Sequence, residues 1–119
     1  MRNPHDKIDL GSIQVDKKVF AEIISSAIHE VNGVYLIQKN IGNRLFEIFG
    51  RKDFPGIAIT VDENSDVTLE LKVLVQYGMN IPDAARQVQE IVKSAIEKTL
   101  DVNVKDINVN VHGIARGKK

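Results

Sequence analysis

The sequence predicts one α+β domain, a two-layer sandwich in which two amphipathic helices cover one face of a mixed or mostly antiparallel sheet. Two segments repeat apolar residues at helical spacing, several shorter ones alternate apolar and polar residues, and the chain of 119 residues has the length of one domain. Its 43% hydrophobic and 27% charged residues are typical of a folded globular protein. We expect a single domain over residues 1–119, with an ordered core at about 8–114 and tails at 1–7 and 115–119.

The first predicted elements are a short strand at Gly11–Val15 and a helix that follows it. Asp16 stands where an N-cap carboxylate would accept hydrogen bonds from the first helical amides. Asn32 and Gly33 are predicted to end the helix, because glycine tolerates the left-handed conformation common at helix C-termini, and a strand follows at residues 34–37. The apolar stripe of this helix comprises Val19, Phe20, Ile23, Ile24, Ala27, Ile28 and Val31.

A polar turn at residues 62–66 separates two segments with strand character, Ile57–Val61 and Val67–Tyr77. We interpret them as the arms of an antiparallel hairpin. Odd-numbered residues of the second arm are apolar or aromatic, whereas most even-numbered ones are polar. A sheet buried on both faces would show a continuous apolar run, so this alternation predicts helices on one side only.

Asn80 and Asp83 have the spacing of a helix N-terminus, and a second amphipathic helix of about five turns is predicted to follow. Its charged side, which includes Lys93 and Glu97, is expected to be solvated. The last predicted strand alternates from Val104 to Val111.

Two parts of the chain depart from ordinary element composition and are candidates for an interface. Residues 40–56 interrupt the strand pattern and carry three of the four phenylalanines. They either pack against the protein's own core edge or offer aromatic and arginine anchors to a partner. The last strand exposes asparagines, which are depleted from strands. The candidate interface residues are Leu45, Phe46, Phe49, Arg51, Asn108 and Asn110.

Composition excludes several function classes. Sixteen basic residues balance sixteen acidic ones, so the chain lacks the excess positive charge that polyanion binding requires, and we do not expect nucleic acid as a partner. The absence of cysteine excludes disulfides, thiolate nucleophiles and cysteine-based metal sites. The first ten residues lack the apolar region of a secretory signal, and charges interrupt every segment that could span a membrane, so we expect a cytoplasmic protein without transmembrane insertion.

No constellation of residues predicts catalysis, a metal or a cofactor, and we expect a protein that is not an enzyme. Ser25 and His29 lie one helical turn apart, but a convex helix face offers neither a pocket nor oxyanion donors. An RNA- or ribosome-associated module remains an alternative, since two-layer α/β domains include RNA-binding folds. It would require a basic stripe formed in space by Lys17, Lys18, Arg44, Arg51 and Lys52.

Several segments together resemble the alkaline-shock, envelope-stress-response family of Gram-positive-type bacteria, over about residues 8–39 and 56–114. They are the helix end Glu30-Val31-Asn32-Gly33-Val34, the strand end Tyr77-Gly78, the helix dipeptide Val88-Gln89 and the final strand up to Gly113-Ile114. The resemblance implies a small, non-enzymatic cytoplasmic binding or scaffold protein that gathers near the membrane through a membrane-anchored protein partner and supports envelope homeostasis. It carries no catalytic residues over to this chain and leaves homo-oligomerisation open.

The sequence departs from the family pattern in two places. Thr99-Leu100-Asp101 stands where family members often have a Thr-Gly turn, and the phenylalanine-rich residues 40–56 are not a shared motif. The second departure leaves the identity of the partner open.

Overall fold

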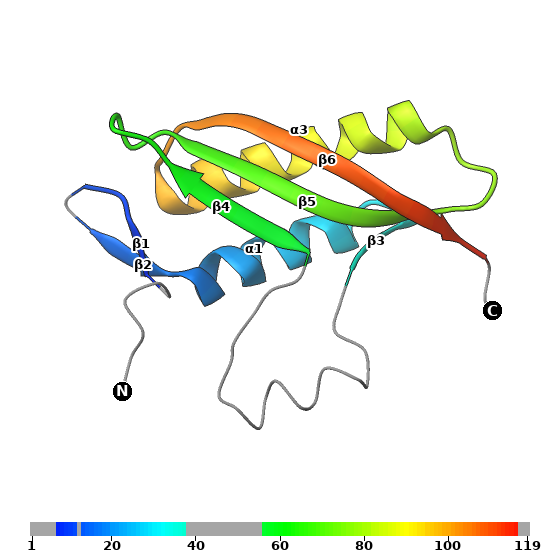
Figure 1. Cartoon of the computed structure of the whole chain (residues 1–119), viewed down its shortest axis with the longest axis horizontal. Helices are drawn as coiled ribbons and strands as arrows, with labels where there is room; N and C mark the ends of the chain where they lie inside the picture. Colours follow the sequence, from blue (N-terminus) through cyan, green and yellow to red (C-terminus); the bar gives the residue numbers. More distant parts are fainter. Residues whose placement is uncertain (1–6, 12, 38–55, 117–119) are drawn as a thin grey trace, which may run out of the picture.

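The computed structural model describes residues 7–11, 13–37 and 56–116, which form two helices and six strands (Figure 1). In chain order these are β1 (Lys7–Asp9), β2 (Gln14–Asp16), α1 (Lys17–His29), β3 (Val34–Leu36), β4 (Ile57–Val61), β5 (Val67–Gln76), α3 (Ile81–Leu100) and β6 (Val104–Ala115). The first two strands form a separate antiparallel hairpin, and the other four form the main sheet.

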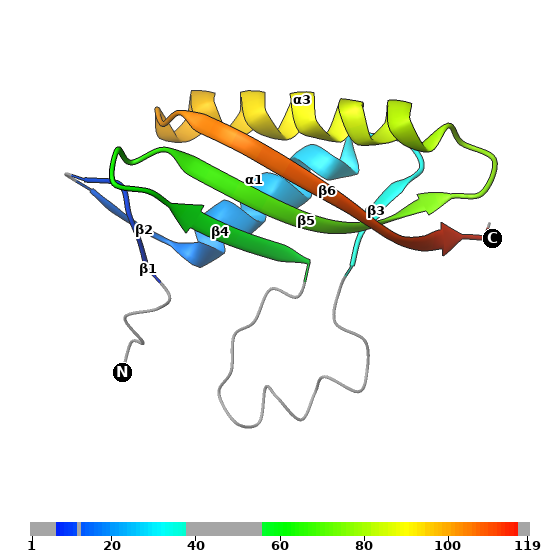
Figure 2. The same ribbon diagram turned by 45° about the horizontal axis from the view of Figure 1, so that its top comes forward.

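The central strand of the main sheet is β5. Strands β3 and β4 pair antiparallel with one of its edges, β3 with Val73–Val75 and β4 with Val67–Leu71. Strand β6 pairs parallel with the other edge, which makes the sheet mixed. Both helices lie on the same side of this sheet (Figure 2). The predicted α+β architecture, with two helices over one face, is therefore confirmed.

The core lies between the sheet and the two helices. Odd-numbered residues of β5, from Val67 to Val75, are fully buried, whereas Glu70, Lys72 and Gln76 are exposed. The alternation predicted from the sequence therefore separates a helix-covered face from an open one. The fully buried helix residues opposite β5 are Phe20 and Ile24 of α1 and Val88, Val92 and Ile96 of α3. Burial of each such side chain stabilises the fold by roughly 1.5–3 kcal/mol.

Helix α1 begins where the sequence predicted but ends earlier. Asp16 is the N-cap residue by position, yet its carboxylate makes no capping hydrogen bond, and one of its oxygens lies 3.6 Å from Lys7 Nζ. The helix ends at His29 rather than at the Asn-Gly pair, because the amides of Glu30 and Val31 bond three residues back and tighten the last turn. Gly33 then has a φ of +83° at the turn into β3.

Helix α3 has the predicted N-terminus, in which Asn80 Oδ1 accepts a hydrogen bond from the Asp83 amide at 3.0 Å. Its C-terminus is less usual, because the C-cap residue Asp101 adopts the left-handed conformation (φ 54°, ψ 46°) that glycine favours. Tyr77 was predicted on the buried face of the hairpin, but it lies beyond the end of β5 and is 67% exposed.

The N-terminal hairpin differs from the prediction of a strand at residues 11–15. Gly11 (φ +96°) lies in the turn, so the strand begins only at Gln14. The preceding strand β1, which the sequence analysis did not identify, buries Ile8 against the core.

Candidate interaction surface

No element of the described part of the chain covers the face of the sheet opposite the helices; we call this surface the open face. Its polar part is set by the register between β5 and β6, in which Glu70 pairs with Asn108 and Lys72 with Asn110. These four side chains are exposed. An acid, a base and two amides thus lie within two adjacent rows of the open face.

The neighbouring row of the open face is apolar. Leu74 is flanked by Tyr35 of β3 on one side and by Gly113 of β6 on the other. A Cβ atom at Gly113 would lie 3.3 Å from Leu74 Cδ2, so the glycine makes room for the leucine side chain. Tyr35 is 48% exposed, and its hydroxyl donates a hydrogen bond to Gln76 Oε1 at 3.2 Å. An aromatic and an aliphatic side chain with polar neighbours therefore form the centre of this surface.

The residues at the two ends of the segment between β3 and β4, Ile37 and Gly56, both form backbone hydrogen bonds with Lys72. The Ile37 amide donates to the Lys72 carbonyl at 3.0 Å, and the Lys72 amide donates to the Gly56 carbonyl at 2.9 Å. Because Lys72 also pairs with Asn110, a single row across the sheet contains the two chain ends and this asparagine. Two strand spacings, about 10 Å, separate Asn110 from the point where the chain leaves and re-enters the sheet.

The structure therefore places part of the predicted interface. Asn108 and Asn110 are exposed on the open face, as their alternation predicted. Leu45, Phe46, Phe49 and Arg51 lie outside the described residues. Tyr35, Leu74 and Gly113 were missed by the sequence analysis, since their proximity depends on strand register.

The other sequence candidates lie away from this surface. Lys17 and Lys18 begin α1 in the helix layer, and the remaining members of the expected basic stripe lie outside the described residues. Ser25 and His29 are exposed on α1. A hollow of about 480 Å³ between α1 and α3 includes neither of them; it is lined by Glu22, Ile23, Ser26, Ala27, Glu30, Ile91, Ser94, Ala95, Lys98 and Thr99.

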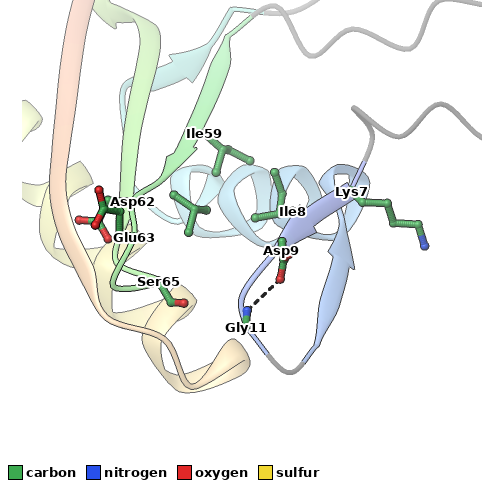
Figure 3. Close-up of a pocket in the computed structure, with 9 residues that line it drawn as sticks. Lys7, Ile8, Asp9, Gly11, Ile59, Asp62, Glu63 and Ser65 are labelled. Atoms are coloured by element: carbon green, nitrogen blue, oxygen red, sulfur yellow. Dashed lines mark hydrogen bonds between the residues drawn. The ribbon is translucent and has the colours of Figure 1, made fainter.

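A second hollow, of about 460 Å³, lies between the N-terminal hairpin and the turn after β4 (Figure 3). Its lining includes three aliphatic side chains and the carboxylates of Asp9, Asp62 and Glu63. Asp62 Oδ1 accepts hydrogen bonds from two amides of its own turn, and Asp9 Oδ1 accepts one from Gly11. Two of these carboxylates thus stabilise local turns. Across residues 7–11, 13–37 and 56–116, no three acidic or histidine side chains converge as a metal site would require.

The charged side of α3 has a role that the sequence analysis did not assign. Lys93 and Glu97 were expected to be solvated, but they bond to the backbone of β6. Glu97 Oε2 accepts from the Val104 amide at 3.0 Å, and Lys93 Nζ donates to the Val104 carbonyl at 3.3 Å. The Lys93 ammonium and the Val104 amide, both hydrogen-bonded to Glu97, hold the pKa of that carboxyl below its usual value.

No helix in the described ranges combines the length and apolar character of a membrane span. No solved structure matches the chain. The uncharacterized proteins YqhY and YloU of Bacillus subtilis (strain 168) are 27% and 26% identical over 115 and 106 residues, which are 96% and 87% of this chain and 84% and 88% of theirs.

A more distant relative carries a functional name. A Streptococcus pyogenes serotype M3 protein called stress response regulator gls24 homolog is 23% identical over 105 residues, which are 85% of this chain and 57% of the relative. The family of alkaline shock protein 23, described as having a cell envelope-related function, matches residues 5–116, in agreement with the resemblance in the sequence. The chain therefore belongs to the alkaline shock protein 23 family.

Proposed function

We propose that this protein is a non-enzymatic binding or scaffold protein of the envelope stress response, which acts in the cytoplasm by holding a membrane-anchored protein partner on its open face. The cell envelope-related description of the family and the stress-regulator name of one relative support the physiological setting. The observation that carries the binding role is the row of Tyr35, Leu74 and Gly113 beside exposed polar side chains.

The composition of the open face suits a protein partner. Protein interfaces commonly have an aromatic or aliphatic centre with a polar rim, and a few central residues contribute most of the binding energy. Here Tyr35 and Leu74 would supply the centre, with Lys72, Gln76 and Asn110 around them. The two ends of the phenylalanine-rich segment flank the same surface at Ile37 and Gly56, so its side chains can join the contact. We expect Leu45, Phe46, Phe49 and Arg51 to contribute in this way.

Mixed charge on the open face argues against RNA as the main ligand. Glu70 and Asp106 share this face with Lys72, whereas phosphate binding requires an excess of positive charge. Among the described strand residues of the main sheet, Tyr35 is the one phenylalanine, tyrosine or tryptophan, so bases would find little to stack on.

The test is capture of membrane-fraction proteins by the purified chain, followed by mass spectrometry and titration of the protein recovered. The double variant Tyr35→Ala, Lys72→Glu should weaken binding of that protein at least about tenfold, as expected for loss of a central anchor. Gln87→Arg on exposed α3 is the control and should bind as the wild type does. Equal affinity of all three proteins, or preferential recovery of RNA, would refute the proposal.

A further inference from the structure

The outer edge of β6 is only partly closed. No described strand pairs with this edge, but the side chains of α3 bond to its first half. Glu97 and Lys93 bond to the Val104 amide and carbonyl, and Gln89 Nε2 donates to the Ile107 carbonyl at 2.9 Å. These bonds satisfy backbone groups that would otherwise be free to pair with another strand. The capping side chains come from successive turns of α3 and end at Gln89.

The alternation of a β-strand shows which backbone amides and carbonyls in the second half of β6 point away from β5. The hydrogen bond from Gln89 shows that the Ile107 carbonyl points away from β5. Backbone groups two and four residues further along a strand point the same way, so the amides and carbonyls of Val109 and Val111 also point away from β5. His112 is an extra residue in the register, which forms a bulge. The Ala115 carbonyl accepts from Tyr77 and therefore faces β5, which directs the polar groups of Ile114 outward. In the described structure, Val109, Val111 and Ile114 thus present uncapped backbone groups along this edge.

On the helix-covered face of the sheet, the side chains beside the uncapped edge are apolar. Val109 and Val111 are half-buried, and Ile114 is 44% exposed. Positions 81 and 85 continue the four-residue spacing of the capping side chains on α3, but they are Ile81, which is 37% exposed, and Ala85. Both charged residues that protect the start of β6, Lys105 and Asp106, lie in the capped half. The hydrogen bonds from α3 side chains therefore end where the apolar side chains of Val109, Val111 and Ile114 begin.

We propose that the uncapped half of β6 pairs antiparallel with the same segment of a second copy of this chain, about a two-fold axis at Val111. With His112 accommodated in the bulge, Val111 faces Val111 of the second copy, and Val109 faces its Ile114. Every side chain that meets its counterpart on the helix side of the joined sheet is then branched and apolar. The two sheets become one continuous sheet, with all four helices on the same side.

A second copy fits this edge because the segment is self-complementary. The same three residues supply both sides of the pairing, and no acidic, lysine or arginine residue lies between Ile107 and Ala115 to oppose its own copy. The whole chain has a formal net charge of zero at pH 7, so two copies do not repel each other strongly. The pairing uses the edge of the sheet and leaves the open face accessible, so it is independent of the proposed partner site.

Cysteine substitution tests the register directly, since the natural chain contains no cysteine. Residues paired by two backbone hydrogen bonds have Cα atoms about 5.5 Å apart, a separation that a disulfide spans. Under mild oxidation Val111→Cys should therefore form a covalent dimer. Val109→Cys and Ile114→Cys should link to each other when mixed, and much more slowly when each is oxidised alone. Ile13→Cys, at a 51% exposed position on the N-terminal hairpin, is the control for random collision.

Light scattering of the unmodified protein supplies the second measurement. We expect a mass of twice 13.3 kDa at high concentration that falls on dilution. Cross-linking of Val111→Cys should exceed that of the control at least about tenfold. A monomer at high concentration, equal cross-linking of the control, or failure of the Val109→Cys and Ile114→Cys mixture would overturn the proposed pairing. Capture of a different protein at the same edge by a monomeric chain would also overturn it.

Discussion

The side chain of Glu97 links the C-terminal part of α3 to the first residue of β6 by hydrogen bonds. Glu97 accepts hydrogen bonds from Lys93 and from the Val104 amide, at 2.8 and 3.0 Å. Most exposed ion pairs contribute little, but this carboxylate also satisfies a backbone amide on a sheet edge. Its effect on stability should therefore be visible as a dependence on pH.

Glu97→Gln should reduce the sensitivity of the fold to acid. In the folded chain the pKa of Glu97 is lowered from 4.5, so its ionised form favours folding above the unfolded value. This contribution is lost as the pH falls through the lower, folded pKa. The difference in melting temperature between wild type and Glu97→Gln should therefore be largest near about pH 7 and shrink towards about pH 3. Glu90→Gln on the same helix is the control, and a difference that did not depend on pH would contradict this account.

Asp101 is a second residue whose backbone conformation predicts a mutational response. Its φ of 54° is costly for most L-residues, by roughly 1–2 kcal/mol, and least costly for glycine. Asp101→Gly should stabilise the fold by up to about 1 kcal/mol, whereas the β-branched Asp101→Val should destabilise it by about 1–2 kcal/mol. Urea midpoints of the three proteins provide the measurement. A stabilising valine would show that the left-handed conformation is not required here.

At the scale of the element, β5 shows why much of the fold was predictable. Its alternation persists over ten residues because one face contacts helices and the other contacts water. The same physics placed Asn108 and Asn110 correctly on the exposed face of β6. Strand β1 has only three residues, which is too short for a periodic signal. The capping of β6 by α3 was missed because helical spacing shows which side of a helix is polar, but not what lies opposite.

The two faces of β5 should respond oppositely to the same substitution. Leu71 is fully buried and Lys72 is exposed. Leu71→Asp places a carboxylate among apolar side chains and should destabilise the fold by more than about 4 kcal/mol. Lys72→Asp should change stability by no more than about 0.5 kcal/mol. Urea denaturation of both variants checks this, and comparable losses would mean that the open face is covered in solution.

At the scale of the whole molecule, the register of β3 and β4 shows how residues 38–56 relate to the sheet. Leu36 pairs with Val73, and Ile57 pairs with Leu71. Between them, the Ile37 amide donates to the Lys72 carbonyl and the Gly56 carbonyl accepts from the Lys72 amide, so both residues lie beside the same residue of β5. If residues 38–56 were removed, Ile37 would face Lys72 and Ile57 would follow in register. The segment is therefore an insertion into what would otherwise be one continuous edge strand.

Deletion of residues 38–56 should yield a folded protein that no longer captures its partner. Joining Ile37 to Ile57 preserves every strand pair of β3 and β4 and removes the entropic penalty of holding the two ends of the intervening segment together, roughly 2–3 kcal/mol. If Phe46 and Phe49 instead fill the core edge, each deletion of a buried phenylalanine costs about 3–5 kcal/mol and the shortened chain is destabilised. Calorimetry separates the two accounts, with Phe46→Ser, Phe49→Ser in the full-length chain as the matched variant. A thermal midpoint at or above that of the wild type, together with loss of capture in both proteins, is the result we expect. Because the insertion begins and ends in the row that contains Asn110, such a result would make the phenylalanines an extension of the open face; a lost unfolding transition in either protein would assign them to the core.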